Sequence, residues 1–362
     1  MEYCQRGSVA GWISHLWNIP AGGYVGPPNP APIDEAVLWE IFKCLVKGCV
    51  AMKYPPFDNP PLNTGAGPAA FYNIPGSNVP GPAYRSETNP EMPGAAPPIR
   101  LDNMVHFDID EYNVMIGGFN TNVPAHPIDN HGVVPVFKLG DFGLAEVMGT
   151  NHMGRKRGYE LWVRRQHGKN DFKTPEAFTE EWDWVYKHPH FPPTRGPAPQ
   201  SSRFVADTAG RYGTETNIYQ IGNVMATIIT GHEHPENFQP GQAGQAVQIA
   251  HPVHGAVWSY GGWLNEPPFN GPYMSNALRD LVQQCLCERP SHRPTLGELE
   301  QRIDAEIAAI AASATPFNPN TVNQCFGGVP VLAQRNRQDV SDWALSRIDD
   351  ITFHGQQPIA YG

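Results

Sequence analysis

Two polar motifs beside a short β-type stretch constrain the fold of this chain more than any other feature. The first motif is His106–Asn113, and the second is Asp141–Gly143, which directly follows an apolar run. Asn113–Ile116 and Val133–Leu139 are short apolar runs joined by a link rich in Gly, Asn and His. This pattern predicts a β-hairpin with an inserted tip. We therefore expect the two motifs to occupy the loops that flank one hairpin.

The motifs contain two carboxylates and one carboxamide, Asp108, Asp141 and Asn113. Phosphoryl transfer from a nucleotide needs one carboxylate that accepts the hydroxyl proton of the substrate and a second that holds Mg²⁺. A carboxamide can hold a further Mg²⁺ without adding negative charge. The residue types and their order therefore suit Mg²⁺-nucleotide chemistry.

The rest of the chain predicts a mostly helical body around this hairpin. Ile33–Met52 carries a wide apolar stripe, and Asp34 lies where the dipole of a helix favours negative charge. Thr216–Thr230 is apolar nearly all round, which predicts a helix buried on every side with Gly231 as its C-terminal cap. Further helices are expected at Gly11–Trp17, at Asn276–Leu286, and from the capping box Thr295–Glu298 through Leu299, Ile303 and Ile307.

Pro and Gly, at 38 and 36 residues, gather in a few stretches that cannot form regular helices. We interpret these stretches as surface insertions in a compact fold. The longest, Tyr54–Pro98, is either a surface loop or a ligand for a proline-recognising module. The others are Ala21–Pro32, Pro189–Pro199 and Pro235–Gly244.

Charge and cysteine usage narrow the class of protein. A net charge of -10 disfavours a nucleic-acid-binding protein, whose contact face is usually basic. The six cysteines lack zinc-site spacing, so we expect reduced and mostly buried thiols. The N-terminal sequence does not match a secretory signal, and no run reaches the roughly 18 apolar residues of a membrane-spanning helix. These features predict a cytoplasmic or nuclear protein without a membrane partner.

Taken in order, the motifs resemble those of the eukaryotic protein kinases of the Ser/Thr type. His106–Asn113 is similar to the catalytic loop, and Asp141–Gly143 to the metal-binding motif. Thr174–Glu176 resembles the end of the activation segment, Thr216–Gly222 the start of the buried helix, and Cys285–Thr295 a segment near the end of the domain. The resemblance covers approximately residues 100–303, and the family order is kept throughout.

The resemblance implies an α+β fold that is mostly α in this chain, the C-terminal lobe of a kinase-like domain over residues 1–310. Residues 1–8 are similar to the hinge between the two lobes, 54–98 is a Pro-rich insertion, 106–113 is the catalytic loop and 141–176 is the activation segment. Residues 311–362 are expected to be a polar C-terminal tail. Because the match starts at the hinge, we expect the N-terminal lobe to be absent and this chain to be an incomplete product.

The family also implies roles for single residues. Asp108 is the expected catalytic base, Asn113 and Asp141 are the expected ligands of Mg²⁺, and the backbone of Glu2, Tyr3 and Cys4 is expected to bond the adenine of ATP. The expected partner is a protein whose hydroxyl receives the γ-phosphoryl group. Structural roles are implied for His106, Phe142, Gly143 and Asn217, and for Glu176 and Arg293, which are expected to form a buried ion pair.

Three positions depart from the family pattern. Phe107 replaces an Arg that meets a phosphate on the activation loop, and Asn217 replaces an Asp that ties the catalytic loop to the buried helix. Asp110 replaces a Lys that contacts the transferred phosphoryl group, so a negative charge faces the nucleotide. The chain is therefore expected to be a weakly active or inactive kinase, and the alternative is a pseudokinase-like protein-interaction module.

Two further features each leave two interpretations open. His232 and His234 are either solvated loop residues or a metal-binding pair. Arg155–Arg157 and Arg164–Arg165 form either a solvated basic loop or a site for an acidic peptide or phosphate.

Overall fold

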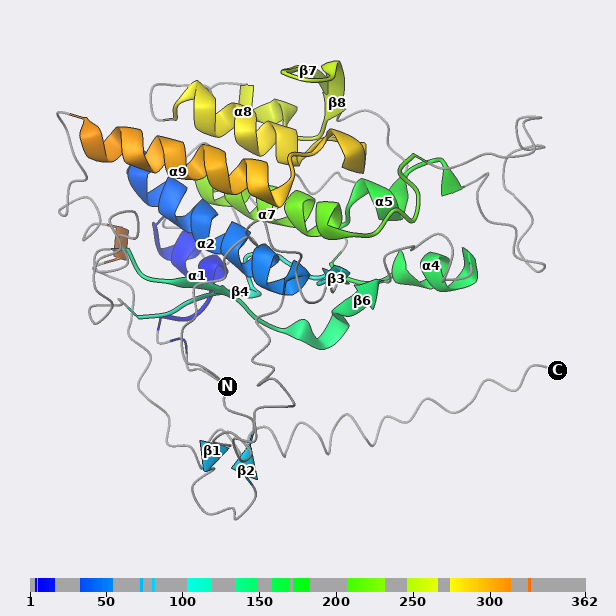
Figure 1. Ribbon diagram of the computed structural model, residues 1–362, viewed down its shortest axis with the longest axis horizontal. Helices are drawn as coiled ribbons and strands as arrows, with labels where there is room; N and C mark the ends of the chain where they lie inside the picture. Colours follow the sequence, from blue (N-terminus) through cyan, green and yellow to red (C-terminus); the bar gives the residue numbers. More distant parts are fainter. Residues whose placement is uncertain are drawn as a thin grey trace, which may run out of the picture.

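The fold is α+β and mostly helical, with small antiparallel sheets (Figure 1). The computed structural model describes residues 4, 6–16, 33–54, 72–73, 80–81, 103–118, 134–148, 158–169, 172–182, 207–231, 246–265, 274–313 and 325–326. Several predicted features lie outside these residues, namely Glu2, Tyr3, Arg155–Arg157, His232, His234 and most of the insertion at 54–98.

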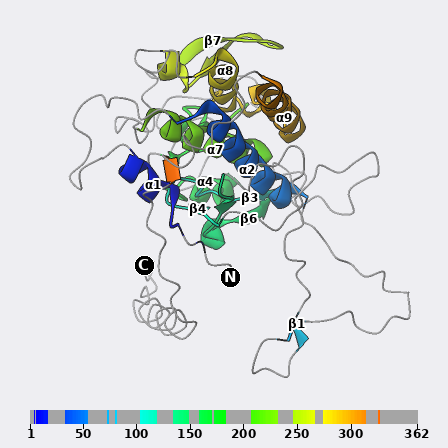
Figure 2. The same ribbon diagram turned by 90° about the vertical axis from the view of Figure 1, so that its left-hand side faces the viewer.

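Four long helices form the centre of the described structure. Helix α2 (Glu35–Lys53) packs against α7 (Thr214–Thr230) and α9 (Leu296–Ala312), and α8 (Asn276–Cys285) packs against α7 (Figures 1 and 2). Shorter helices are α1 (Val9–Leu16), α4 (Gly158–Arg164) and α5 (Pro175–Phe178), with the 3-10 turns η1 (Phe142–Leu144), η3 (Gly262–Asn265) and η4 (Pro290–His292).

Helices α2, α7 and α8 lie within two residues of their predicted bounds, and α9 starts after its predicted capping residue and continues beyond Ile307 to Ala312. The Asp34 side chain caps α2 by accepting a hydrogen bond from Ala36 N at 3.0 Å. Thr295 and Glu298 form the predicted capping box of α9, and Gly231 ends α7 with a positive φ of 66°. Helix α7 is buried on nearly all sides, as its apolar sequence predicts.

The predicted hairpin is present, and three further strand pairs accompany it. β4 (Val114–Ile116) pairs antiparallel with β5 (Phe137–Leu139), in the register Val114↔Leu139. The prediction of a single hairpin was wrong, because the structure also contains these pairs: β1 (Tyr72–Asn73) with β2 (Pro80–Gly81), β3 (Asn103–Val105) with β6 (Glu146–Met148), and β7 (Val247–His251) with β8 (Gly255–Ser259).

Two residues of the predicted polar tail belong to the core. Phe326 stacks on Trp12 of α1 with ring centroids 5.1 Å apart, and Trp12 Nε1 donates a hydrogen bond to Cys325 O at 2.7 Å. Both Cys325 and Phe326 are buried in the main hydrophobic cluster. Residues 325–326 therefore pack against α1, which the composition of the tail does not reveal.

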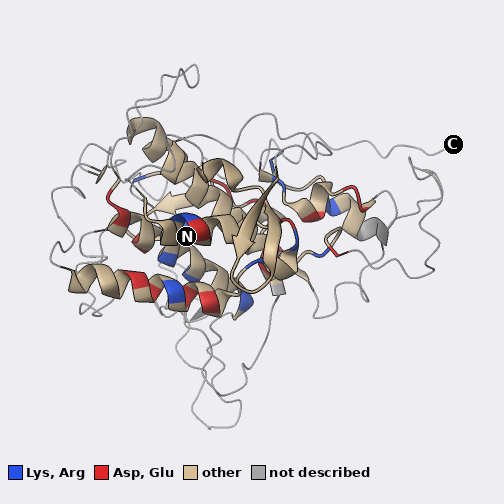
Figure 3. Ribbon diagram, turned by 90° about the horizontal axis from the view of Figure 1, so that it is seen from above, with Lys and Arg blue, Asp and Glu red and all other residues tan. Residues whose placement is uncertain are grey.

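Acidic and basic residues are interspersed along the described helices (Figure 3). Two ion pairs join α2 to α9, Lys43 with Asp304 at 3.1 Å and Lys47 with Glu300 at 3.3 Å.

Two observations concern the expectations about the cysteines and about membrane-spanning helices. All six cysteines are free, and five of them are buried while Cys4 is partly exposed. Among the described helices, none combines the length and the apolar character that a membrane span requires.

Candidate functional site

Gly140 joins the two polar motifs. His106 Nε2 donates a hydrogen bond to Gly140 O at 2.9 Å, and Gly140 N donates to Asn113 O at 2.8 Å. The rings of His106 and Phe142 also touch, with centroids 4.7 Å apart. The loop 106–113 and the turn after Gly140 are therefore held together beside the β4–β5 hairpin, as the order of the motifs predicts.

Asp108 lies in this site, and one of its two carboxylate oxygens accepts a hydrogen bond while the other accepts none from the described residues. Asn113 Nδ2 donates to the backbone oxygen of Asp108 at 2.7 Å and to its Oδ2 at 2.9 Å. Oδ1 of Asp108 is buried and accepts no hydrogen bond from the described part of the protein. Because buried polar atoms are nearly always paired, this oxygen is an exception and is available to accept a hydrogen bond.

Burial raises the pKa of Asp108, and the neighbouring Asp110 raises it further, while Lys169 and Asn113 act in the opposite direction. A carboxylate with a raised pKa accepts a proton more readily than a solvated one. A perturbed carboxyl group with an unpaired oxygen is a common sign of a functional site. The geometry thus suits proton acceptance at Asp108 Oδ1.

Two residues of this site have strained backbone conformations. Among the residues that the structure describes, Phe107 and Asp141 are the non-glycine residues with positive φ, at 66° and 53°. Such a conformation costs on the order of 1–3 kcal/mol for each residue and persists where the surroundings enforce it. Asp141 Oδ1 accepts a hydrogen bond from Gly143 N at 3.3 Å, while the Asp141 side chain stays exposed. In this conformation the Asp141 side chain is exposed to solvent.

Asn217 connects the 106–113 loop to the buried helix α7. Its Oδ1 accepts a hydrogen bond from His106 N at 2.9 Å, and its Nδ2 donates to Met104 O at 2.8 Å. A carboxylate could make only the first of these contacts, because it has no hydrogen to donate. The amide at this position therefore ties the end of β3 and the start of the loop to α7.

The side chain of Asp110 is buried within the 106–113 loop, where both of its oxygens have partners. Its side chain is fully buried, and its Oδ1 accepts hydrogen bonds from Tyr112 N at 2.8 Å and Asn113 N at 3.0 Å. Its Oδ2 forms an ion pair with Lys169. The negative charge of Asp110 is thus compensated by a lysine that lies 59 residues further along the chain.

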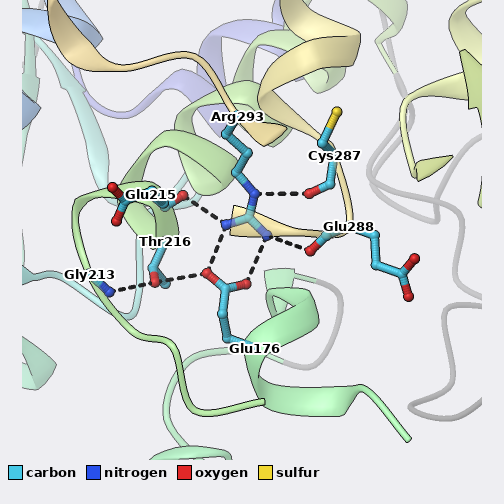
Figure 4. A network of polar contacts seen from close by, with 7 residues as sticks. All are labelled: Glu176, Gly213, Glu215, Thr216, Cys287, Glu288 and Arg293. Carbon is cyan, nitrogen blue, oxygen red and sulfur yellow. Dashed lines mark hydrogen bonds and ion pairs between the residues drawn. The ribbon is translucent and has the colours of Figure 1, made fainter. Parts of the chain in front are cut away.

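The predicted ion pair of Glu176 and Arg293 is confirmed (Figure 4). Arg293 Nη1 lies 2.7 Å from Glu176 Oε1, Arg293 Nη2 lies 2.9 Å from Oε2, and both side chains are fully buried. Thr216 Oγ1 donates to the same carboxylate at 2.9 Å. Burial acts to lower the pKa of Arg293, and the attraction of Glu176 outweighs it, so the net shift is upward. This pair ties α5 to α7 and to the segment before α9.

Residues 6–8 run along the β4–β5 hairpin. Arg6 N donates to Ile116 O at 3.2 Å, Ile116 N donates to Gly7 O at 2.8 Å, and Ser8 forms a bridge with Met115. Of the three predicted adenine contacts, Cys4 is described here, and Glu2 and Tyr3 lie outside the described residues.

The oxygen donors fit Mg²⁺ better than a transition metal. Within the described part of the chain, no group of three or more His, Cys, Asp or Glu side chains is placed to hold a metal ion. Mg²⁺ needs fewer protein ligands, because it keeps several waters and is commonly held by one or two carboxylates together with phosphate oxygens. Asp141 and the amide oxygen of Asn113 offer this kind of donor set.

Lowering the pH from 7.5 to 5 is expected to destabilise the protein in part through His106. Burial lowers the pKa of His106 in the folded state, whereas in the unfolded chain it titrates near its ordinary value of about 6.5. The unfolded state therefore takes up the proton first, so this contribution is complete above about pH 6.5 and is lost as the pH falls through the folded pKa. The measurement is urea unfolding at both pH values, for the natural protein and for His106→Gln.

The glutamine variant should lose less stability between the two pH values than the natural protein loses. Carboxylates and the other histidines with lowered pKa values, His167, His251 and His292, contribute equally to both proteins and cancel in the comparison. An equal loss in the two proteins would mean that folding does not lower the pKa of His106.

No model of a known protein family matches the chain, and a search of curated proteins likewise gives no match.

Proposed function

We propose that this chain is the larger, mostly helical lobe of a protein kinase-like domain, with a site for Mg²⁺ and ATP and for transfer of the γ-phosphoryl group to a protein Ser or Thr hydroxyl. The observation that carries the proposal is the assembly of Asp108, Asn113 and Asp141 around Gly140, with Asp108 Oδ1 left unpaired. The ion pair of Glu176 and Arg293 supports it, because the kinase resemblance is what predicts that pair.

Each residue at this site has a definite part in the proposed reaction. Asp141 and Asn113 would hold Mg²⁺, which supplies positive charge against the phosphates when bound. Asp108 would orient the attacking hydroxyl through Oδ1 and accept its proton. His106 and Asn217 would keep the loop in place through their contacts with Gly140 and Met104. Positioning of such groups, together with charge stabilisation, supplies most of the rate enhancement in enzymatic phosphoryl transfer.

A non-catalytic interaction module is the second candidate, and exposed apolar side chains favour it. Phe142, Leu144 and Val147 lie next to the site and are all exposed. Apolar side chains that cluster on a surface often mark a contact with another polypeptide. In this case the lobe would bind a partner protein without transferring phosphate.

Replacing Asp108 with asparagine is expected to lower phosphoryl transfer about 10²- to 10⁴-fold, the usual contribution of a general base. The assay follows incorporation of labelled γ-phosphate from Mg²⁺-ATP into Ser- and Thr-containing peptides by the full chain. The matched control is Asp280→Asn, which changes an exposed carboxylate on α8.

The control should transfer phosphate at the rate of the natural protein, and circular dichroism should show that both variants are folded. Transfer that survives Asp108→Asn unchanged would refute the role of Asp108 as base. Absence of transfer in the natural protein would reject the kinase activity and favour the interaction module.

A further inference from the structure

Lys169 lies against the 106–113 loop although it is remote from that loop in sequence. Its Nζ forms an ion pair with the buried Oδ2 of Asp110 and lies 4.6 Å from the centroid of the Tyr112 ring. An aromatic face and a carboxylate thus hold the same ammonium group. The side chain of Lys169 is nevertheless 46% exposed, so the ammonium group also borders the solvent.

The backbone before Lys169 fits closely over the loop. Gly168 has a positive φ of 73°, and a Cβ atom at this position would lie 2.4 Å from Phe107 O and 3.5 Å from Asp108 Oδ1. Glycine is therefore required both by the backbone conformation and by the lack of space. The His167 ring rests on the Phe107 ring, with centroids 5.5 Å apart. Residues 167–169 are consequently fixed beside the open oxygen of Asp108.

Two other basic side chains of this region are engaged elsewhere. Arg164 forms a bidentate ion pair with Glu146 of β6. Arg165 packs over the rings of Trp162 and Trp182, at 4.2 and 5.2 Å from their centroids, and donates a hydrogen bond to Ala177 O at 2.6 Å. Lys169 differs from them because its contacts lie within the loop that carries Asp108.

An ammonium group has three hydrogens to donate, and the contact with Asp110 takes one of them. The remaining hydrogens of Lys169 can therefore reach an anion at the surface of the site. The kinase resemblance implies a lysine at position 110, where this chain has Asp110, and Lys169 places an ammonium group against that same residue.

We infer that Lys169 binds the γ-phosphate of the nucleotide and replaces the lysine that is missing at position 110. The inference rests on the proposed function and adds a residue to its site. During transfer the bond from the γ-phosphorus to the oxygen bridging to the β-phosphate breaks, the bond to the substrate hydroxyl oxygen forms, and the hydroxyl proton passes to Asp108. Lys169 stays protonated and offsets the negative charge on the phosphoryl oxygens.

The test compares the binding of Mg²⁺-ATP and Mg²⁺-ADP by calorimetry, because only ATP carries the γ-phosphate. Lys169→Met is expected to weaken Mg²⁺-ATP binding roughly tenfold, as loss of a hydrogen bond to a charged group does, and to leave Mg²⁺-ADP binding unchanged. Lys169→Arg keeps the positive charge and should retain most of the ATP affinity. The control Lys47→Met breaks a lysine–carboxylate pair between α2 and α9 and should affect neither nucleotide.

The outcomes separate the inference from the proposed function. If Lys169→Met binds both nucleotides like the natural protein, or weakens both equally, Lys169 makes no γ-phosphate contact and the inference is overturned while the proposed function stands. If the natural protein binds neither nucleotide saturably, the proposed function fails and the inference fails with it.

Discussion

Replacing Arg293 with methionine is expected to lower the free energy of unfolding by about 3–5 kcal/mol, the usual cost of removing one partner from a buried ion pair. Methionine fills much of the same volume but cannot donate a hydrogen bond. The Glu176 carboxylate would remain buried with Thr216 as its remaining hydrogen-bonding neighbour in the network (Figure 4).

Arg293 holds three backbone oxygens as well as the Glu176 carboxylate, which is why the expected loss is large. It donates five hydrogen bonds, two to Glu176 and three to the backbone oxygens of Glu215, Cys287 and Glu288. The planar guanidinium group can serve all of these acceptors at once, whereas a lysine could not. Loss of Arg293 thus leaves several buried acceptors unpaired, each of which carries a desolvation cost.

Arg289→Met is the matched control. Arg289 lies four positions earlier and pairs with Asp207 at 3.5 Å, but the two side chains are 53% and 58% exposed. Exposed ion pairs typically contribute about 0.2–1 kcal/mol. Urea unfolding of both variants gives the comparison. Similar losses for Arg289→Met and Arg293→Met would contradict the structural role assigned to the buried pair.

Replacing Phe326 with alanine is expected to cost about 3–5 kcal/mol of unfolding free energy, as truncation of a buried phenylalanine does. The Phe326 ring stacks on Trp12 and meets the Phe137 ring edge-on at 6.2 Å between centroids. Its removal would leave a cavity where α1, β5 and the segment after α9 meet.

Phe142→Ala makes the same chemical change at an exposed position. The Phe142 side chain is 47% exposed, so its truncation should cost less than about 1 kcal/mol in unfolding experiments. Thermal or urea unfolding of the two variants measures the difference. If Phe326→Ala were no more destabilising than Phe142→Ala, residues 325–326 would not belong to the folded core.

The features that the sequence predicts correctly depend on local patterns. Helix α7 follows from an apolar run that ends at glycine, and α9 follows from a four-residue capping box. The β4–β5 hairpin follows from two short apolar runs. The pair of Glu176 and Arg293 is not local, and it was predictable only because the order of several motifs resembles a family in which that pair occurs.

The features that the sequence does not reveal depend on contacts between distant residues. Lys169 has no neighbour in sequence that marks it as the partner of Asp110, and only the folded chain brings the two together. The hairpin of β7 and β8 is mostly exposed, with Val247 and Trp258 turned to solvent, so its apolar residues do not alternate as those of a half-buried sheet do.

Replacement of Asp141 is the most direct test of the site as a whole. Calorimetric titration with Mg²⁺-ATP should show saturable binding to the natural protein. Asp141→Asn should weaken that binding at least roughly tenfold, which corresponds to about 1.4 kcal/mol, because the amide no longer attracts the metal ion with a full charge. Asp280→Asn, at an exposed position on α8, should bind like the natural protein. Binding that is absent from the natural protein, or equal in Asp141→Asn and the natural protein, would contradict a nucleotide site built on Asp108, Asn113 and Asp141.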